Sequence, residues 1–492
     1  MISTGADNLG LRHADRLFIG GKWIEGASGS EIEVISPDTE EPVCHVAAGC
    51  DADMDRAVAA ARDAFDIGPW PSMLPAQRAD HIDAMVRVLE SRARQLANAW
   101  TRQVGGLASM APAVVAGGTR AFADAAANAR SFSFEALCPA EFVDTAIIAH
   151  EPVGVVAAIA PWNGPYVLMA NKVANALAAG CTVIMKPAPE TPAEAYIIAE
   201  AAEEAGLPPG VINLVCAGRS ASEHLVRSEG VDKVSFTGST AAGKTIAALC
   251  AQRIARCSLE LGGKSAAIIR DDFDVEEAGA MLARTISIMC GQVCAMLSRA
   301  IVPRRRHNAL AAAIARHMAR LRIGPSTDPM TQLGPVALQR QLFKIEDYIE
   351  QGRASARLVH GGGRPALMER GFFIEPTLFA DVDNRSVIAQ EEIFGPVLCL
   401  IPCEDDEDAI RIANESHFGL NGSVLTHDCD AAYAIARRIR TGTVGQNGMR
   451  MEPAMPFGGF RQSGLGREGG VHGLRAFLET KSILLDGRPT AL

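Results

Sequence analysis

The sequence has 492 residues, with a hydrophobic fraction of 48% and a charged fraction of 21%, which is typical of a globular chain of about three domains at roughly 150 residues each. This composition excludes a disordered chain, a fibrous repeat and a small disulfide scaffold. The formal net charge is −10, and phosphate binding depends on clustered basic residues, so we expect no nucleic-acid or membrane partner.

The twelve cysteines are irregularly spaced, and residues 1–10 hold no apolar stretch that would form a secretory signal. No apolar run approaches the roughly 18 residues of a transmembrane helix. We therefore expect a cytoplasmic protein with reduced thiols, one of which could be a nucleophile.

The first half of the chain predicts strands at 17–24 and 32–35, followed by helices at 53–65, 76–104 and 108–129. From residue 153 strands and helices alternate. The predicted strands are 153–160, 181–186, 211–215 and 233–236, and the predicted helices are 165–179, 193–205, 220–228 and 240–251. Such alternation predicts a parallel sheet that is covered on both faces.

A second α/β series follows, with strands predicted at 265–269, 300–303, 388–401 and 423–426 and helices at 275–290 and 307–320. The run Arg304 to Arg306 is interpreted as a solvated loop. Residues 481–485 form a terminal apolar strand, which needs an edge to pair with, for example on another subunit.

Two glycine-containing turns are candidate sites. Gly238-Ser-Thr-Ala-Ala-Gly243 follows a predicted strand and opens a helix, where backbone N–H groups can bind a phosphate. An ordinary structural turn explains this pattern equally well. In Glu260-Leu-Gly-Gly-Lys264 the carboxylate could be a general base with a raised pKa, or simply a surface side chain.

Two further residues could carry chemistry. Cys294, in Gly291-Gln-Val-Cys294, is a candidate nucleophile, although most buried cysteines are small core residues. Asn163 follows a predicted buried strand, where open α/β sheets bind ligands, and its amide could stabilise an oxyanion or simply occupy a turn. The sequence contains no metal-binding motif and no serine-hydrolase elbow, so we expect no metal.

Taken together, these motifs resemble the NAD(P)-dependent aldehyde dehydrogenase family over about residues 17 to 485. The motifs that carry the resemblance, in chain order, are Pro161-Trp-Asn163, Lys186-Pro, Phe236-Thr-Gly238-Ser239, Glu260-Leu-Gly-Gly-Lys264, Gly291-Gln-x-Cys294, Glu392-Ile-Phe394-Gly-Pro-Val397 and Pro456-Phe-Gly-Gly-Phe-Arg-Gln-Ser-Gly-Leu-Gly-Arg467-Glu468.

The resemblance implies a mechanism in which Cys294 attacks the aldehyde, Asn163 holds the oxyanion and Glu260 activates the water that hydrolyses the thioester. Because Glu260 is present, the hydrolytic branch is favoured over a CoA-acylating semialdehyde dehydrogenase. A non-catalytic protein on the same fold is the other alternative. The implied cofactor contacts are Trp162, Lys186, Gly238, Ser239, Gly243, Gln341, Glu392 and Phe394, and the implied substrate tunnel is bordered by Gly164, Leu168, Asn171, Val293 and Ala295.

NAD is the expected cofactor and NADP the alternative, because Pro189 stands where the family often has a ribose-binding glutamate and Glu190 follows it. Gly164 and the methionines of the 448–455 loop favour a medium-sized apolar or aromatic aldehyde.

The fold implied is an α/β protein with a Rossmann-like cofactor domain, an α/β catalytic domain and a small β oligomerisation element. We expect 1–130 and 152–261 to form the cofactor domain, and 262–477, with 462–477 as a return segment, to form the catalytic domain. Residues 131–151 and 478–492 would form the third element, which joins the chain into a homodimer or homotetramer.

Overall fold

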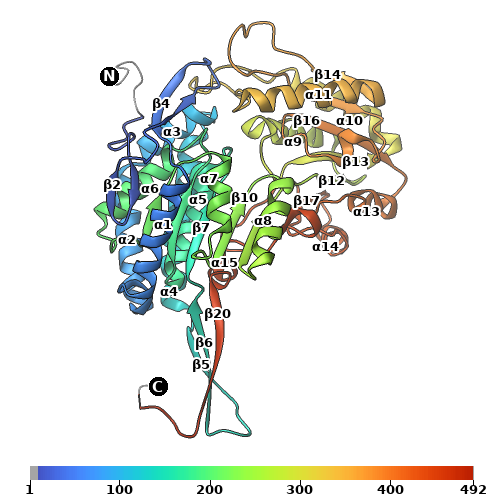
Figure 1. The fold of residues 1–492 in the computed structure, drawn as a ribbon. Coiled ribbons are helices and arrows are strands. Elements are labelled where there is room, and N and C mark those ends of the chain that lie inside the picture. The colour runs from blue at the N-terminus through green and yellow to red at the C-terminus, as the bar shows by residue number, and fades with distance from the viewer. Residues whose placement is uncertain (1–8, 491–492) are drawn as a thin grey trace.

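The computed structural model describes residues 9–490 of the chain. The prediction that the chain has no secretory signal was based on residues 1–10, and residues 1–8 lie outside the described residues. Two large sheets lie side by side, and a third, narrow sheet projects from the base of the molecule (Figure 1).

The first large sheet has eight strands in the order β19-β11-β10-β7-β8-β9-β1-β2, of which β11, β10, β7, β8 and β9 are parallel. Because the five strands run in one direction, their carboxyl ends meet at one edge of the sheet. The bounds are β1 (Leu17–Ile19), β2 (Lys22–Ile24), β7 (Val155–Ile159), β8 (Thr182–Lys186), β9 (Ile212–Leu214), β10 (Lys233–Thr237), β11 (Arg256–Glu260) and β19 (Gly464–Leu465).

Helices cover both faces of this sheet, as the alternation predicted. Alternate residues of β7 enter different cores, with Val156 and Ala158 on one face and Val155 and Ala157 on the other. The first face packs against α2 (Pro75–Ser91), α3 (Ala93–Val104), α4 (Ala111–Ser131), α5 (Pro165–Ala179) and α6 (Ala193–Glu204), and the second against α1 (Asp51–Asp66), α7 (Arg219–Arg227) and α8 (Thr240–Gln252).

The second large sheet has the order β14-β15-β16-β13-β12-β17-β18, and only the β14–β15 pair is antiparallel. Its strands are β12 (Ser265–Ile269), β13 (Leu297–Pro303), β14 (Arg357–His360), β15 (Thr377–Ala380), β16 (Val397–Cys403), β17 (Gly422–Leu425) and β18 (Gly445–Gln446). Its helices are α9 (Val275–Ser287), α10 (Arg304–Met318), α11 (Gln339–Ser355), α12 (Val387–Gln390), α13 (Asp406–Asn414) and α14 (Cys429–Ala436).

Several predicted elements differ from the structure. The helix predicted over 76–104 is two helices that meet at Arg92, whose side chain binds Glu200 and Glu204 of α6. The strand predicted over 388–401 is helix α12, a loop and strand β16, because two glutamates and Gly395-Pro396 interrupt the apolar run.

Two other local predictions were also wrong. The helix predicted over 275–290 ends at Ser287 and is followed by a 3-10 turn over Ile288–Gly291. The arginine run opens helix α10 rather than forming a loop, and there Arg304 pairs with Glu404 and Arg305 with Asp271.

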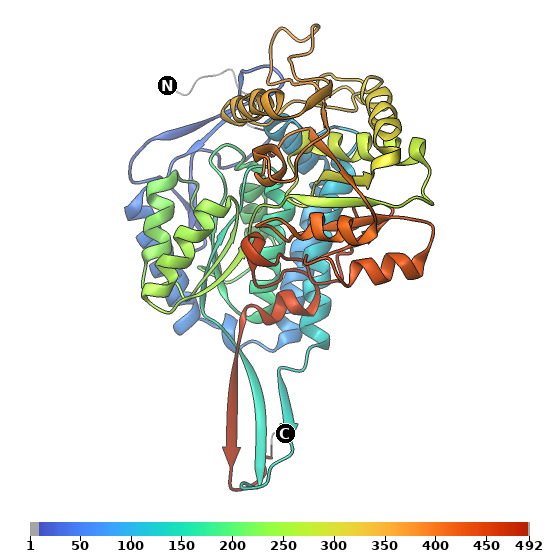
Figure 2. The same ribbon diagram turned by 90° about the vertical axis from the view of Figure 1, so that its right-hand side faces the viewer.

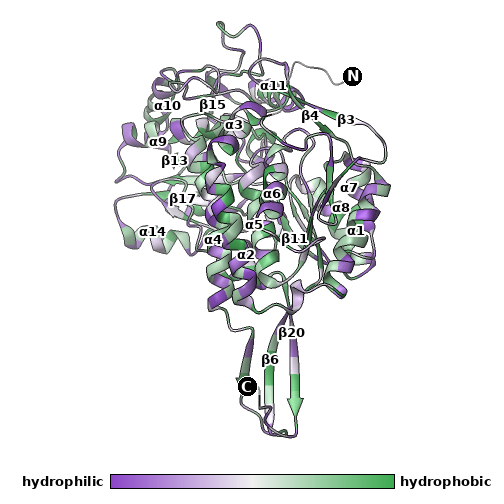
Figure 3. Cartoon of the chain, turned by 90° about the vertical axis from the view of Figure 1, so that its left-hand side faces the viewer, coloured by the Kyte–Doolittle hydropathy of each residue, from purple (hydrophilic) through white to green (hydrophobic). Residues whose placement is uncertain are grey.

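The narrow sheet joins segments from distant parts of the chain. Strand β20 (Leu478–Leu485) runs antiparallel to β6 (Thr145–Pro152), which pairs in turn with β5 (Glu135–Cys138). Figure 2 shows these strands extending away from the body, and in Figure 3 β20 carries both hydrophilic and hydrophobic residues. The short helix α15 (Gly470–Arg475) leads into β20, and β3 (Glu31–Ile35) pairs with β4 (Pro42–Ala47) near the N-terminus.

Within residues 9–490, no helix has the length and apolar character needed to cross a bilayer.

Candidate active site

The predicted site residues of the first sheet lie at its carboxyl edge. Trp162 and Asn163 follow β7, Lys186 ends β8, Ser239 follows β10 and Glu260 ends β11. The second sheet contributes residues just before its strands, with Cys294 before β13 and Glu392 before β16.

Asn163 connects the two halves directly. Its buried side-chain amide Nδ2 donates to the backbone carbonyl of Gln292 at 2.9 Å, two residues before Cys294. An amide NH2 has two donors, so the second N–H remains available beside the nucleophile segment. The structure therefore brings the predicted oxyanion donor to the predicted nucleophile.

Cys294 is half-buried, and two carboxylates affect its thiol electrostatically. Burial, followed by the negative charges of Glu392 and Glu260, raises the pKa of its thiol to about 12. Hydrogen bonds from the backbone N–H groups of Ala295 and Cys294 act in the opposite direction and favour the thiolate. In this form of the protein the thiol is protonated at neutral pH, so a positive charge close to it would activate it.

Glu260 is 3% exposed, and neither carboxylate oxygen has a hydrogen-bond partner within residues 9–490. Burial and then the charge of Glu468 raise its pKa well above the ordinary value, while Lys172 and Arg467 lower it. A Cβ atom added to Gly458 would lie 2.7 Å from Glu260 Oε1. The 456–468 motif therefore encloses the candidate base.

Two charged residues near Glu260 were not predicted as site residues. Lys172 Nζ donates to Glu468 Oε1 at 2.5 Å, and the lysine side chain is fully buried. The signal for Lys172 was its place as the one charged residue in the otherwise apolar helix α5. Glu468 was already visible as the last residue of the final motif.

The glycines between Glu260 and Lys264 allow close contacts across the site. A Cβ at Gly263 would lie 2.5 Å from the Cys294 carbonyl oxygen, and one at Gly262 would lie 2.3 Å from Glu392 Oε2. Gly263 N–H donates to Glu392 Oε1 at 3.0 Å. Burial raises the pKa of Glu392 to about 7, although this hydrogen bond and the positive charges of Lys344 and Lys264 each lower it.

The other predicted cofactor residues have structural contacts of their own. Ser239 caps α8, where its hydroxyl accepts from Ala242 N at 3.3 Å. Gly243 is packed against Leu261, and a Cβ at Gly238 would meet the ring of Phe236 at 2.5 Å. These glycines let the helix approach the sheet closely.

Lys186 is buried, which lowers its pKa, while the charges of Cys216 and Glu190 raise it. The side chain of Glu190 points toward α11, where its carboxylate pairs with Arg340 at 2.6 Å. This ion pair joins the β8–α6 loop to the second half of the chain.

Gln341 supports the loop that holds Glu392 and Phe394. Its Nε2 donates to the carbonyls of Ile393 at 2.8 Å and Phe394 at 3.0 Å. The ring of Phe394 lies nearly perpendicular to that of Trp162, with a centroid distance of 5.4 Å. The two predicted aromatic contacts thus meet across the site.

Two of the predicted tunnel residues flank Cys294 in the chain, and the other three lie in or just before α5. Leu168 Cδ1 lies 3.4 Å from the position of a Cβ at Gly164, and Asn171 donates to Val167 O in its own helix at 3.0 Å. Val293 is half-buried, whereas Ala295 is fully buried, and its carbonyl accepts from Asn421 Nδ2 at 3.1 Å. Their roles in substrate binding stay predictions.

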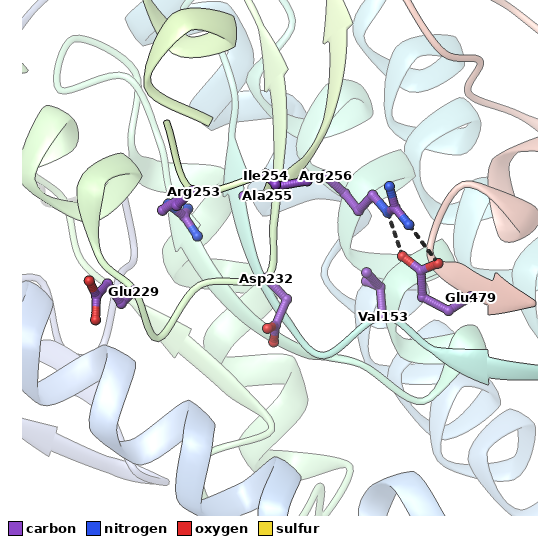
Figure 4. A pocket seen from close by; sticks show the side chains of 8 residues that line it. All are labelled: Val153, Glu229, Asp232, Arg253, Ile254, Ala255, Arg256 and Glu479. Carbon is purple, nitrogen blue, oxygen red and sulfur yellow. Dashed lines mark hydrogen bonds and ion pairs between the residues drawn. The ribbon is translucent and has the colours of Figure 1, made fainter. Parts of the chain in front are cut away.

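A pocket of about 470 Å³ lies at the opposite, amino edge of the first sheet (Figure 4). There Arg256 of β11 makes two hydrogen bonds, at 2.5 and 3.0 Å, with Glu479 of β20. This pocket is distant from the predicted catalytic residues along the strands, and its mixed charges tie the narrow sheet to the first large sheet.

Comparison with known proteins agrees with this geometry. The sequence pattern of the aldehyde dehydrogenase family matches residues 23–483. A geranial dehydrogenase of Castellaniella defragrans is 43% identical over 475 residues, which cover 96% of this chain and 98% of that protein.

Solved structures are equally similar. A Mycobacterium tuberculosis aldehyde dehydrogenase complexed with NAD+ gives a TM-score of 0.92 at 43% identity and covers 96% of this chain and 98% of that one. A mutant of aldehyde dehydrogenase C from Pseudomonas syringae, in complex with NAD+ and octanal, gives 0.93 at 38% identity, with coverages of 97% and 98%.

The chain belongs to the aldehyde dehydrogenase family, and it is an oxidoreductase that converts an aldehyde into a carboxylic acid. The α/β fold class, with a Rossmann-like part and a second α/β part, is confirmed.

Proposed function

We propose that this enzyme oxidises its aldehyde with NAD, using Cys294 as nucleophile, Asn163 as oxyanion donor and Glu260 as general base. The observation that carries this assignment is the Asn163–Gln292 hydrogen bond, together with the approach of Gly263 to the Cys294 carbonyl. These contacts support a shared site, because they join two other stretches of the chain to the backbone of the segment that holds Cys294.

The residues present suit a dinucleotide. The N-terminus of α8 at Ser239 favours a pyrophosphate, Lys186 offers a cation at the end of β8, and the buried carboxylate of Glu392 can accept hydrogen bonds from a ribose. Trp162 and Phe394 supply apolar surface for a ring. When bound, NAD would accept the hydride that leaves the substrate carbon.

The protein's own residues perform the remaining steps. Once the Cys294 thiol has lost its proton to water, its sulfur attacks the carbonyl carbon, and the second N–H of Asn163 with the Cys294 backbone N–H stabilises the oxygen as it becomes negative. After hydride loss a thioester links Cys294 to the acyl group. Glu260, whose oxygens accept no hydrogen bond from residues 9–490, takes a proton from the water that hydrolyses the thioester.

Glu190 supports a preference for NAD over NADP, because a carboxylate beside Lys186 opposes the added charge of a 2′-phosphate. The ion pair with Arg340 partly neutralises the Glu190 carboxylate and so weakens its repulsion of a 2′-phosphate. We expect kcat/KM to be higher with NAD, and we expect Glu190→Gln to narrow the difference. A higher kcat/KM with NADP in the unaltered enzyme would contradict this preference.

A medium-sized apolar or aromatic aldehyde fits the predicted tunnel. Gly164 leaves space beside Leu168, and the exposed side chains of Met451 and Met455 offer an adaptable apolar surface. Relatives that act on geranial or bind octanal support the same class. A kinetic preference for short charged aldehydes would refute this substrate class.

The domain boundaries proposed from the sequence have support in the sheets. The first large sheet draws seven of its eight strands from residues 17–260, the second draws all of its strands from residues 265–446, and the narrow sheet draws its strands from residues 135–152 and 478–485. We therefore keep the division into a cofactor domain, a catalytic domain and an oligomerisation element.

Self-association through the narrow sheet is part of the proposal. β20 and β5 are its edge strands. Leu137 of β5 is 52% exposed and Leu484 of β20 is 62% exposed, and Phe142 in the loop between β5 and β6 is 94% exposed. We expect a dimer or tetramer by light scattering, and Leu484→Lys should shift it toward smaller species. The twelve cysteines are all unpaired, which supports a reducing compartment such as the cytoplasm.

One assay tests the catalytic assignment. A panel of apolar, aromatic and charged aldehydes is incubated with NAD, with and without CoA, and NADH formation is followed. Oxidation without CoA supports hydrolysis, whereas strict dependence on CoA would indicate the acylating alternative. No oxidation of any aldehyde, in protein that retains a reactive Cys294 thiol, would favour a non-catalytic protein.

A further inference from the structure

Gln292 lies two residues before Cys294, and its hydrogen bonds join three separate stretches of the chain. It is 2% exposed, and its side chain is bonded at both ends. Oε1 accepts from the backbone N–H of Ala337 at 3.0 Å, and Nε2 donates to the carbonyl of Met289 at 2.8 Å. Its own carbonyl accepts from Asn163.

The backbone just before Gln292 has an unusual conformation. Met289, Cys290 and Gly291 have φ values of 48°, 52° and 72°, so three consecutive residues are left-handed. Side chains disfavour this region, and non-glycine residues stay in it only where their surroundings fix them. At Gly291 a Cβ would lie 2.1 Å from the carbonyl oxygen of Gly395.

The contacts of Gln292 close this left-handed turn. The carbonyl of Met289 accepts from both the side-chain Nε2 and the backbone N–H of Gln292, the latter at 3.0 Å. The Ala337 contact fixes the other end of the side chain to the segment that precedes α11. The turn is thus held from within and from a neighbouring element.

We propose that Gln292 is a positioning residue, which sets the Cys294 sulfur and the Asn163 amide at their working separation. This inference rests on the catalytic roles proposed above for those two residues. A shift of the Gln292 carbonyl would move Asn163 and Cys294 relative to each other, because the carbonyl binds the first and is two residues from the second. Displacements of about 1 Å at a reacting centre can reduce turnover by about 100-fold.

Two substitutions separate the contacts. Gln292→Met has a similar volume and removes both side-chain hydrogen bonds. Gln292→Glu keeps an acceptor for Ala337 N–H but loses the donor to the Met289 carbonyl. Gln95→Met is a matched control, since Gln95 also donates to two backbone carbonyls, those of Leu9 and Gly10, far from the site along α3.

The experiment measures kcat per reactive thiol, KM for NAD, and the rate of Cys294 alkylation by iodoacetamide in the full-length variants. We expect Gln292→Met to lower kcat by about 100-fold with KM for NAD within about threefold, and Gln292→Glu to show a smaller loss. Gln95→Met should retain wild-type kcat.

A purely structural role for Gln292 predicts a lower melting temperature with unchanged kcat per reactive thiol, and that result in either Gln292 variant would overturn the inference. If Gln292→Met does not fold, Gln292→Glu decides. If the unaltered protein oxidises no aldehyde, the proposed function fails independently of this inference. The rates of Cys294 alkylation then test whether Gln292 positions the thiol. Altered rates in the Gln292 variants support positioning, and rates equal to that of Gln95→Met overturn it.

Discussion

Replacing Glu260 by glutamine tests the general base with little risk to the fold. The two side chains have the same shape, and the Glu260 oxygens have no hydrogen-bond partner within the described residues, so the substitution breaks no contact there. It also replaces a buried carboxyl, whose ionised form burial and the charge of Glu468 disfavour, by a neutral group, so we expect the melting temperature to stay equal or to rise.

The magnitude follows from the role. A positioned general base contributes about 10²–10⁴-fold to a proton-transfer step, which at about 1.4 kcal/mol for each factor of ten is roughly 3–5 kcal/mol of barrier. Glu260 acts only after hydride transfer in the proposed sequence. Glu260→Gln should therefore keep a first burst of NADH, about one per active thiol, and lose steady-state turnover by about that factor.

Rapid mixing with NADH fluorescence as the signal measures both phases in one record. Glu468→Gln serves as a comparison, because it alters a carboxyl near the site and leaves Glu260 in place. An unchanged steady-state rate in Glu260→Gln would show that another group activates the water. Loss of the burst together with turnover would place Glu260 before hydride transfer and would falsify the assigned step.

Further predictions concern pH and stability. The pKa of Glu260 is raised, so the base is protonated at low pH and kcat should rise as the pH passes through that pKa. Glu468→Gln removes a like charge and should move this rise to lower pH, whereas Lys172→Met removes an opposite charge and should move it to higher pH. Identical pH profiles in the three proteins would contradict this electrostatic account. Glu392 has a pKa of about 7, so KM for NAD should increase as the pH falls below it, and Glu392→Gln should flatten this dependence in a titration of initial rates. Arg299 is 1% exposed and donates to four oxygens at 2.8–3.0 Å, so Arg299→Met should lower stability by about 1–3 kcal/mol for each oxygen left without a donor, which thermal unfolding would detect as a large fall in melting temperature.

The sequence predicted the α/β architecture well because its signal is local. Short apolar strands alternate with helices between residues 153 and 251, and the observed bounds in this stretch differ by only one or two residues. Prediction was weaker where an apolar run was interrupted. The strand expected over 388–401 was wrong because periodicity does not distinguish a short buried helix from a strand, and the turn at Phe394 has a φ of 57°.

Local sequence motifs predicted only some of the residues of the candidate site. Cys294, Glu260 and Asn163 stand in recognisable motifs, and the contacts between those motifs agree with a shared site. Lys172 and Gln292 were missed as site residues because their importance depends on partners far away in the chain. Lys172 binds a carboxylate from near the C-terminus, and Gln292 binds Asn163 and Ala337.

The pairing of β20 with β6 has a consequence for biosynthesis. Residues 478–485 are synthesised more than 300 residues after residues 145–152, yet the two segments are neighbours in the narrow sheet. During translation β6 therefore has an unpaired edge for most of the time needed to synthesise the chain, and such an edge is prone to pairing with other nascent chains. The narrow sheet closes only after β20 has left the ribosome, so subunit assembly through the complete sheet follows the synthesis of both segments.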